Sequence, residues 1–487
     1  MGVDLYTIDS YPYSELAELR PAKYGAGRRR SGALRYADII ATFDIETTNI
    51  KEKKQAIMWH WQACIGGKVI TGRTWDEFSL FLERIHESVP KELCFVFWVH
   101  NLAFEWQFLR AIHNFNPLPP REYIPDEVFC VNGRKVVRAS IGERFEFRCS
   151  YFLTNMSLRE FLNKMGVEHK KTEMDYSLTR WPWDPVSEKD LEYCIDDVLG
   201  LYEALKINLE HDGHTLATVP LSSTGYVRAD FKRAMRSSNG LSVVRECAPS
   251  YNVYLHLRRA FRGGNTHANR CYTNQILTGV KSADRASSYP DVLVNMVYPV
   301  KPFYRDLRVK HLSDLWERTP YVLNVTFTNI RLRYPFNGCP YLSIHKCQIL
   351  QEVINDNGRV VEAAVLSTYL TDVDVQIVRD MYEWDSDTVL SCYRSEYGRL
   401  PEAMIDVTMD YYRKKTELKG VKDQEIYYMK SKNKLNSIYG MCATNPIRTN
   451  MKFNGLDFAP EEQNEEVMLE RANKKAFTVY AWGCWCT

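Results

Sequence analysis

The chain has 487 residues, of which 45% are hydrophobic and 25% charged, and its 63 Lys and Arg nearly balance its 61 Asp and Glu. This composition excludes a disordered or membrane-spanning chain, and the length predicts two to four domains. The balanced overall charge gives no support for nucleic-acid binding, and it does not bear on a locally basic channel.

The first elements indicate an α/β domain over residues 38–221. Residues 1–37 contain turn-forming residues and are expected to form a partly ordered leader. The apolar, β-branched run 39–43 predicts a strand, and 94–99 predicts a second, buried one. Helices are expected over 104–112 and 187–209, the second with Ser187 as its N-cap. Strands alternating with helices are typical of α/β folds.

The remainder predicts an α+β region in several parts. The residue pattern of 222–300 differs from that of the first domain. Residues 301–400 contain prolines and strand-like runs such as 321–327, which suggest a compact insertion, and 401–444 are predicted to be helical. Residues 445–474 separate these helices from the apolar run 475–487, which we expect to be cut off inside an element. No segment is long and apolar enough to cross a bilayer and no signal peptide precedes the domain, so an intracellular protein is expected.

Acidic residues gather at the ends of the predicted elements. Asp44 and Glu46 are two apart on a strand and project from one face, while Tyr193 and Asp197 are four apart on a helix. Glu105 follows the second strand. Such acids suit two Mg²⁺ or Mn²⁺ ions in phosphodiester hydrolysis, with Tyr193 orienting the attacking water. Each acid alone is more often structural, but their order and spacing favour a site.

A basic and aromatic segment precedes Gly440. Lys432, Asn436 and Tyr439 share one face of a predicted helix that we expect to stop at this glycine. A lysine there suits a triphosphate, and an aromatic ring suits a base or sugar. A solvated helix with a packed tyrosine is an equal alternative for this segment alone. The turn at 261–264 also has two interpretations, a contact with a phosphate backbone or a linker.

The three acidic segments resemble the three exonuclease motifs of proofreading DNA polymerases, in which four acids bind two metals. The resemblance assigns these roles to Asp44, Glu46, Glu105 and Asp197, although the second motif usually supplies aspartate. It implies that the single-stranded 3′ end is held by Thr47, Asn101, Phe104 and Ser150. Lys171 resembles a lysine with a catalytic role upstream of the third motif.

The segment 284–290 resembles the first polymerase motif of family B, and 432–440 resembles the second. The resemblance implies that Asp284 binds both catalytic metals and that Tyr289 screens the sugar against a 2′-hydroxyl. It makes Lys432 a triphosphate ligand, Asn436 a positioning residue and Tyr439 an aromatic of the nucleotide pocket. Two ions per active site, primer-template DNA and deoxynucleoside triphosphates are the implied cofactors and partners.

The order of motifs resembles the protein-primed subgroup of family B DNA polymerases. Arg262, Gly263 and Gly264 match its DNA-contacting Tyr-x-Gly-Gly turn, with Phe261 in place of tyrosine. The resemblance implies a ribonuclease H-like exonuclease domain at 38–221, palm at 222–300 and 475–487, and fingers at 401–444. The segments 301–400 and 445–474 match its two terminal-protein regions, and a terminal protein would prime synthesis.

The third polymerase motif, Tyr-x-Asp-x-Asp, does not occur after Tyr439. We therefore expect an N-terminal part of a longer viral replicative polymerase, acting in the host cytoplasm, that lacks part of the palm and the thumb. A stand-alone exonuclease with a degenerate polymerase half is one alternative. A non-catalytic DNA-binding replication scaffold is the other.

Overall fold

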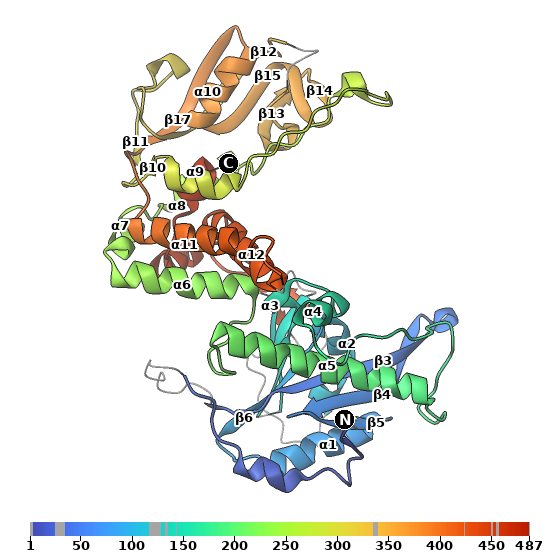
Figure 1. Cartoon of the computed structure of the whole chain (residues 1–487). Coiled ribbons are helices and arrows are strands. Elements are labelled where there is room, and N and C mark those ends of the chain that lie inside the picture. The colour runs from blue at the N-terminus through green and yellow to red at the C-terminus, as the bar shows by residue number, and fades with distance from the viewer. Residues whose placement is uncertain are drawn as a thin grey trace. The chain divides into compact units, whose positions relative to one another are not determined.

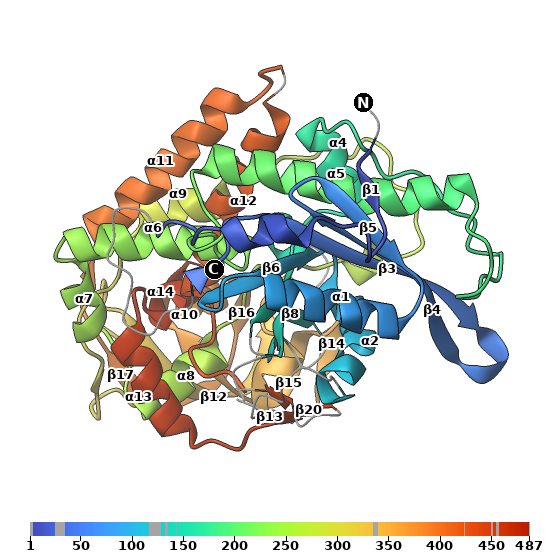
Figure 2. The same ribbon diagram turned by 90° about the horizontal axis from the view of Figure 1, so that it is seen from below.

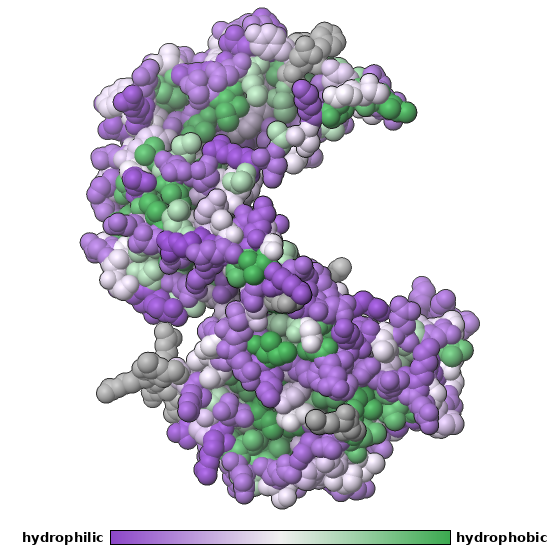
Figure 3. All heavy atoms as spheres, viewed as in Figure 1, coloured by the Kyte–Doolittle hydropathy of each residue, from purple (hydrophilic) through white to green (hydrophobic). Residues whose placement is uncertain are grey.

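The computed structural model describes residues 3–24, 35–115, 128–131, 135–142, 144–334, 339–422, 424–449, 451–453 and 457–486. The chain forms two compact units. Unit 1 comprises Met1–Tyr226 and Thr449–Glu462, and unit 2 comprises Val227–Arg448 and Gln463–Thr487. Figure 1 shows the elements of both units, and Figure 3 shows that hydrophilic residues cover much of the visible face of each. Among the described residues, no helix is both long and apolar enough to span a membrane.

Unit 1 is built on a nine-stranded mixed sheet with the order β1-β5-β4-β3-β6-β9-β8-β7, in which β2 also pairs with β6. Strands β3, β6 and β9 run parallel, whereas β3, β4 and β5 form an antiparallel meander. The strand bounds are β1 (Leu5–Tyr6), β2 (Arg35–Tyr36), β3 (Ala41–Ile50), β4 (Gln55–Ile65), β5 (Lys68–Gly72), β6 (Leu93–Val99), β7 (Val128–Val131), β8 (Lys135–Ile141) and β9 (Phe145–Cys149).

Helices cover both faces of this sheet, as Figure 2 shows for α1 and α5. On one face, the buried side chains of α1 and α2 join the main core with Phe43 and Phe97 of the central strands. On the other face, the hydroxyl of Thr42 donates a 2.7 Å hydrogen bond to the carbonyl of Val198 in α5. The helix bounds are α1 (Trp75–Ser88), α2 (Leu102–Phe115), α3 (Tyr151–Thr154), α4 (Leu158–Met165) and α5 (Glu188–Asp212).

Two segments distant in sequence complete unit 1. Strand β1 pairs with β5, and Tyr11 and Leu16 are buried in the main core, so residues 3–24 belong to the folded unit rather than to a separate leader. The hairpin of β19 (Met451–Phe453) and β20 (Phe458–Pro460) adds Phe453 to the same core, with its ring 5.4 Å from that of Trp106. Burial of apolar side chains therefore fixes both segments in unit 1.

Unit 2 combines a helical core with a second sheet. The helices are α6 (Ser223–Ser237, entering from unit 1), α7 (Gly240–Glu246), α8 (Tyr251–Ala260), α9 (Ser288–Asn295), α11 (Glu402–Leu418), α12 (Glu425–Cys442), α13 (Glu465–Lys475) and α14 (Tyr480–Trp485). Their apolar faces bury one another, and the indole of Trp482 in α14 donates a 3.0 Å hydrogen bond to the carbonyl of Pro299. The predicted helical region 401–444 is thus two helices, α11 and α12.

The second sheet has seven strands and its own core, with α10 (Asp372–Met381) packed against it. Its long strands β12 and β15 pair antiparallel. This sheet falls inside the segment 301–400, for which a compact region was predicted. The strands are β11 (Tyr304–Arg305), β12 (Tyr321–Leu332), β13 (Cys347–Gln351), β14 (Ile354–Asp356), β15 (Arg359–Thr371), β16 (Tyr382–Glu383) and β17 (Ser386–Arg394), and β10 (Tyr298–Pro299) pairs separately with β18 (Tyr397–Gly398).

Candidate functional site

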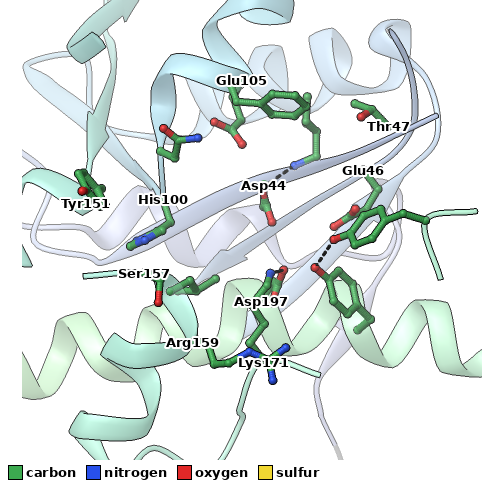
Figure 4. Close-up of a pocket in the computed structure, with 16 residues that line it drawn as sticks. Asp44, Glu46, Thr47, His100, Glu105, Tyr151, Ser157, Arg159, Lys171 and Asp197 are labelled. Atoms are coloured by element: carbon green, nitrogen blue, oxygen red, sulfur yellow. Dashed lines mark hydrogen bonds and ion pairs between the residues drawn. The ribbon is translucent and has the colours of Figure 1, made fainter. Parts of the chain in front are cut away.

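A pocket of about 660 Å³ in unit 1 contains three acids from two elements. Asp44 and Glu46 project from β3, as expected for alternate residues of a strand, and Asp197 projects from α5. One carboxylate oxygen of each lies within 4.8 Å of the others. Figure 4 shows the three carboxyl groups turned toward a common space. This donor set of hard oxygen ligands fits Mg²⁺ or Mn²⁺.

Glu105, the fourth predicted acid, lies in the same pocket at the start of α2. Its side chain faces Asp44 in Figure 4 and is buried. Burial raises the pKa of Glu105, and the negative charge of Asp44 raises it further. Glu105 therefore lines the pocket next to Asp44 but lies outside the group of three acids that converge within 4.8 Å.

The acids of the pocket bind protons more tightly than free carboxylic acids do. Burial, followed by the charge of Asp197, raises the pKa of Asp44 to about 7. Burial and the charges of Asp44 and Asp197 likewise raise the pKa of Glu46, and burial raises that of Asp197. Buried like charges disfavour ionisation, so a cation in this pocket would be stabilised by replacing protons.

Lys171 supplies a positive charge at the edge of the cluster. Its ammonium is hydrogen-bonded to the carboxylate of Asp197 and lies 4.8 Å from the ring centroid of Tyr193. Although burial lowers the pKa of Lys171, the charges of Asp197 and Asp44 outweigh that effect and raise it. The chain before Lys171 crosses α5 closely at Gly200, where a Cβ would lie 2.4 Å from the carbonyl of His169. Glycine at this position therefore lets the lysine reach the acids.

Tyr193 lies on the helical face predicted to carry Asp197, one turn before it. Its hydroxyl is 2.8 Å from that of Tyr176. Burial, followed by the charge of Asp197, raises the pKa of Tyr193, so the phenol stays protonated and able to donate. The partner Tyr176 is a pocket residue that sequence reasoning did not assign.

Other pocket residues also escaped the sequence analysis. The amide of Gln62 donates to Glu46 at 3.4 Å, and Gln62 itself pairs opposite Asp44 in the β3–β4 ladder. Arg159 lines the pocket beside Ser157, the N-cap residue of α4. The N-cap pattern at Ser157 is a local signal that the sequence contains. The position of Gln62 depends on the register of β4 against β3, which no local pattern predicts.

Three of the four residues predicted to hold the 3′ end line the pocket. Thr47 follows the acids of β3, Asn101 precedes α2 with a φ of +74°, and the ring of Phe104 is 41% exposed. Ser150 does not line the pocket, since it is buried and its hydroxyl donates to the carbonyl of Val99 at 3.2 Å, so its contact with the 3′ end stays a prediction. It contributes to the wall of the site through a 3.0 Å contact with His100, which lines the pocket.

The second predicted constellation lies in unit 2, where two of its aromatic residues meet. The rings of Tyr289 in α9 and Tyr439 in α12 stack with centroids 4.1 Å apart and planes 5° apart. Ser287, at φ +53°, is within 2.7 Å of the ammonium of Lys415. A Cβ added at Gly264 would lie 2.8 Å from the hydroxyl of Tyr289, so this predicted glycine closely approaches the stack.

Several details of this constellation differ from expectation. Asp284 is exposed and lies in an irregular segment before α9 rather than at a strand end, since no strand precedes it among residues 261–287, all of which are described. Helix α12 continues through Gly440 to Cys442, because no left-handed cap forms at that glycine. Lys432 and Asn436 precede Tyr439 by two turns and one turn of the same helix.

One side chain of the predicted DNA-contacting turn makes its contacts inside unit 2. The guanidinium of Arg262 is buried, donates to the carbonyl of Tyr369 at 2.8 Å and lies 3.5 Å from Asp374. Gly263 adopts a φ of +74°, which favours glycine, and has open space around its Cβ position. A backbone contact with DNA at Gly263 and Gly264 stays a prediction, whereas the Arg262 side chain anchors the turn.

Comparison with known proteins places the chain in a family. Residues 154–481 match the family described as DNA polymerase type B, organellar and viral. Among solved structures, the chain is similar to phi29 DNA polymerase complexed with single-stranded DNA, at 15% identity and a TM-score of 0.68, covering 92% of this chain and 75% of that one. The same enzyme with primer-template DNA gives 16% identity and a TM-score of 0.67, covering 90% and 75%. These likenesses show the fold, and no curated protein sequence matches the chain.

Proposed function

The chain belongs to the organellar and viral type B DNA polymerases, and from this premise we propose that it is a replicative DNA polymerase whose unit 1 is a 3′-to-5′ proofreading exonuclease. The central strand order of unit 1, an antiparallel meander of β3 to β5 followed by parallel β6 and β9, supports a ribonuclease H-like exonuclease domain. The observation that carries the proposal is the convergence of Asp44, Glu46 and Asp197 within 4.8 Å.

Two Mg²⁺ or Mn²⁺ ions would be held by these three acids with Glu105, and when bound they would supply a nucleophilic hydroxide and stabilise the charge of the phosphoryl transition state. The protein's own groups prepare the reaction. Tyr193 holds a proton and orients the attacking water, while Lys171 balances the charge of Asp197. Thr47, Asn101 and Phe104 position the 3′-terminal nucleotide, with the exposed ring of Phe104 available for stacking on a base.

In unit 2, the stacked pair Tyr289 and Tyr439 forms one wall of the proposed nucleotide site. Lys432 binds the triphosphate as a point charge, Asn436 positions the nucleotide and Asp284 is the metal-binding acid. Asp284 is solvent-exposed, so it can bind a hard cation without displacing a buried partner. The same two-ion chemistry would serve nucleotidyl transfer.

Protein priming is the finer part of the proposal. The proposal rests on the resemblance of the segments 301–400 and 445–474 to the two terminal-protein regions of the protein-primed subgroup, and the first of these segments contains an independent sheet. The β12–β15 sheet has its own apolar core, as a docking module requires. A terminal protein supplying a hydroxyl primer is therefore the proposed partner, together with DNA and deoxynucleoside triphosphates.

The exonuclease assignment is tested by degradation of 5′-labelled single-stranded DNA in Mg²⁺. Asp44→Ala should abolish degradation because it removes an acid from the metal-binding group. Asp196→Asn is the matched control, since Asp196 is the neighbouring buried acid of α5 but lies outside the group of three. Undiminished cleavage by purified Asp44→Ala protein would refute the assignment.

A further inference from the structure

A second pocket, of about 360 Å³, lies wholly within unit 2 and shares no lining residue with the pocket around Asp44. Its walls come from α6, α7 and the turn after it, the end of α12 and the loop that follows, α13, and the irregular segment between α13 and α14. Neither proposed catalytic centre uses this pocket, although part of its lining belongs to the segment 445–474.

The lining of this pocket is strongly basic. Four cations contribute to it, namely Arg228, Lys232, Arg448 and Lys475, whereas the described residues that line it include no Asp or Glu. Arg228 and Lys232 also lie over the ring of Phe477, at 5.8 and 5.4 Å from its centroid. Partial burial, followed by the positive charge of Arg448, lowers the pKa of Arg228. Cations that repel one another in this way favour an anionic ligand between them.

Hydrogen bonds hold the walls of the pocket in place. The amide of Asn473 in α13 donates to the carbonyl of Pro249 at 3.1 Å, which ties two walls together. The loop after α12 is fixed by Asn445, whose side-chain oxygen accepts from Tyr254 at 2.5 Å and from the backbone of Ile447 at 3.1 Å. A pocket fixed before binding loses little conformational entropy when a ligand enters.

We propose that this pocket binds one nucleotide, with its phosphate among the four cations and its sugar and base against the apolar side. Val244, Met441 and Val479 form that side and are buried. The volume lies near the lower end of the roughly 300–1,000 Å³ typical of small-ligand sites, which suits a single nucleotide. The nucleotide is either free or part of a single strand, because both present the same phosphate chemistry. This inference does not rest on either proposed catalytic centre.

The test measures binding of deoxythymidine monophosphate, thymidine and a (dT)₁₀ strand to the whole chain in EDTA, where metal-dependent sites are silent. Lys475→Gln should weaken binding of a phosphate-bearing probe about tenfold, as expected for loss of one charge-assisted contact. Lys474→Gln is the matched control, because both lysines lie in the last turn of α13 but only Lys475 lines the pocket. Ala248→Phe, which fills the pocket without changing charge, should weaken binding of the same probe.

The probes separate the two sources of the phosphate. If Lys475→Gln weakens binding of the monophosphate alone, the ligand is a free nucleotide. If it weakens binding of (dT)₁₀ alone, and reduces the slope of log affinity against log salt concentration by about 0.7, the ligand is a single strand. Losses for both support one site that takes either source. The proposal is overturned if Lys475→Gln and Lys474→Gln behave alike, if thymidine binds as tightly as its monophosphate, or if Ala248→Phe leaves binding of both phosphate probes unchanged.

Discussion

Asp44→Asn should stabilise the metal-free protein above neutral pH while removing its response to Mg²⁺. The carboxyl of Asp44 has its pKa raised from 3.8 to about 7 in the folded chain. Because the folded state then binds the proton more tightly than the unfolded state, the stability from this group is full below pH 3.8 and is lost as the pH rises through 7. At pH 8 the folded protein must hold a charge that its surroundings disfavour.

The size of the effect follows from the shift. Roughly three pKa units at about 1.4 kcal/mol each give an upper limit of about 4 kcal/mol. Asp44 is partly exposed to the pocket, and its titration is coupled to those of Asp197 and Glu46. We therefore expect a smaller gain, of about 2 kcal/mol, in the free energy of unfolding. For a unit of this size, that gain corresponds to a rise of roughly 4–8 °C in Tm. The asparagine oxygen can still accept the 3.0 Å hydrogen bond from the backbone of Ile45.

Thermal melting in EDTA and in Mg²⁺, at pH 5 and pH 8, provides the assay. Wild-type protein should gain Tm from Mg²⁺ at pH 8, because an ion that binds only the folded state stabilises it. Asp196→Asn serves as the control, since burial raises the pKa of Asp196 to about 6 outside the three-acid group. That variant should gain stability in EDTA at pH 8 and retain the Mg²⁺ response. A lower Tm for Asp44→Asn in EDTA at pH 8 would refute the burial argument, and an undiminished Mg²⁺ response would refute the metal site.

Two further variants test the neighbouring groups. Lys171→Met should move the pH midpoint of Mg²⁺ binding upward, because the lysine charge lowers the pKa of Asp44, Glu46 and Asp197. Calorimetric titration of Mg²⁺ from pH 6 to pH 9 measures this midpoint. An unchanged midpoint would contradict the prediction. Tyr439→Leu should weaken deoxynucleoside triphosphate binding several-fold by removing a stacked ring worth about 0.5–1.5 kcal/mol, whereas Tyr439→Phe should retain it. Equal affinities for the Leu and Phe variants in a fluorescence titration would show that the stack does not shape the nucleotide site.

The acids of unit 1 could be predicted because their relationships are local. Alternate residues of a strand share a face, and residues four apart share a face of a helix, so Asp44 with Glu46 and Tyr193 with Asp197 were readable from spacing. Their convergence required only that β3 and α5 pack together, which the structure shows through the bond from Thr42 to Val198.

Features that depend on tertiary packing were not readable. Gln62 reaches Glu46 through the register of β4 against β3, which no local pattern specifies. Ser150 matched a motif position, but the motif says nothing of burial, and the structure turns its hydroxyl inward. Likewise, Phe453 is buried in the core of unit 1 although it lies more than 200 residues after Tyr226, where the first segment of that unit ends. Burial of its apolar ring favours this position.

The acid cluster also explains how unit 1 can fold before it binds any ion. Four buried or half-buried carboxyl groups would repel one another if all were ionised, and two devices relieve that repulsion. Burial and the charge of Asp44 raise the pKa of Glu105, which favours its neutral form, and the ammonium of Lys171 balances a charge at Asp197. Because the pKa values of Asp44, Glu46 and Asp197 are raised, a metal ion that binds them must compete with protons, so metal affinity and pH are coupled in this pocket. The proposed exonuclease activity should therefore weaken as the pH falls below 7, while these carboxyl groups contribute more to the stability of the folded unit.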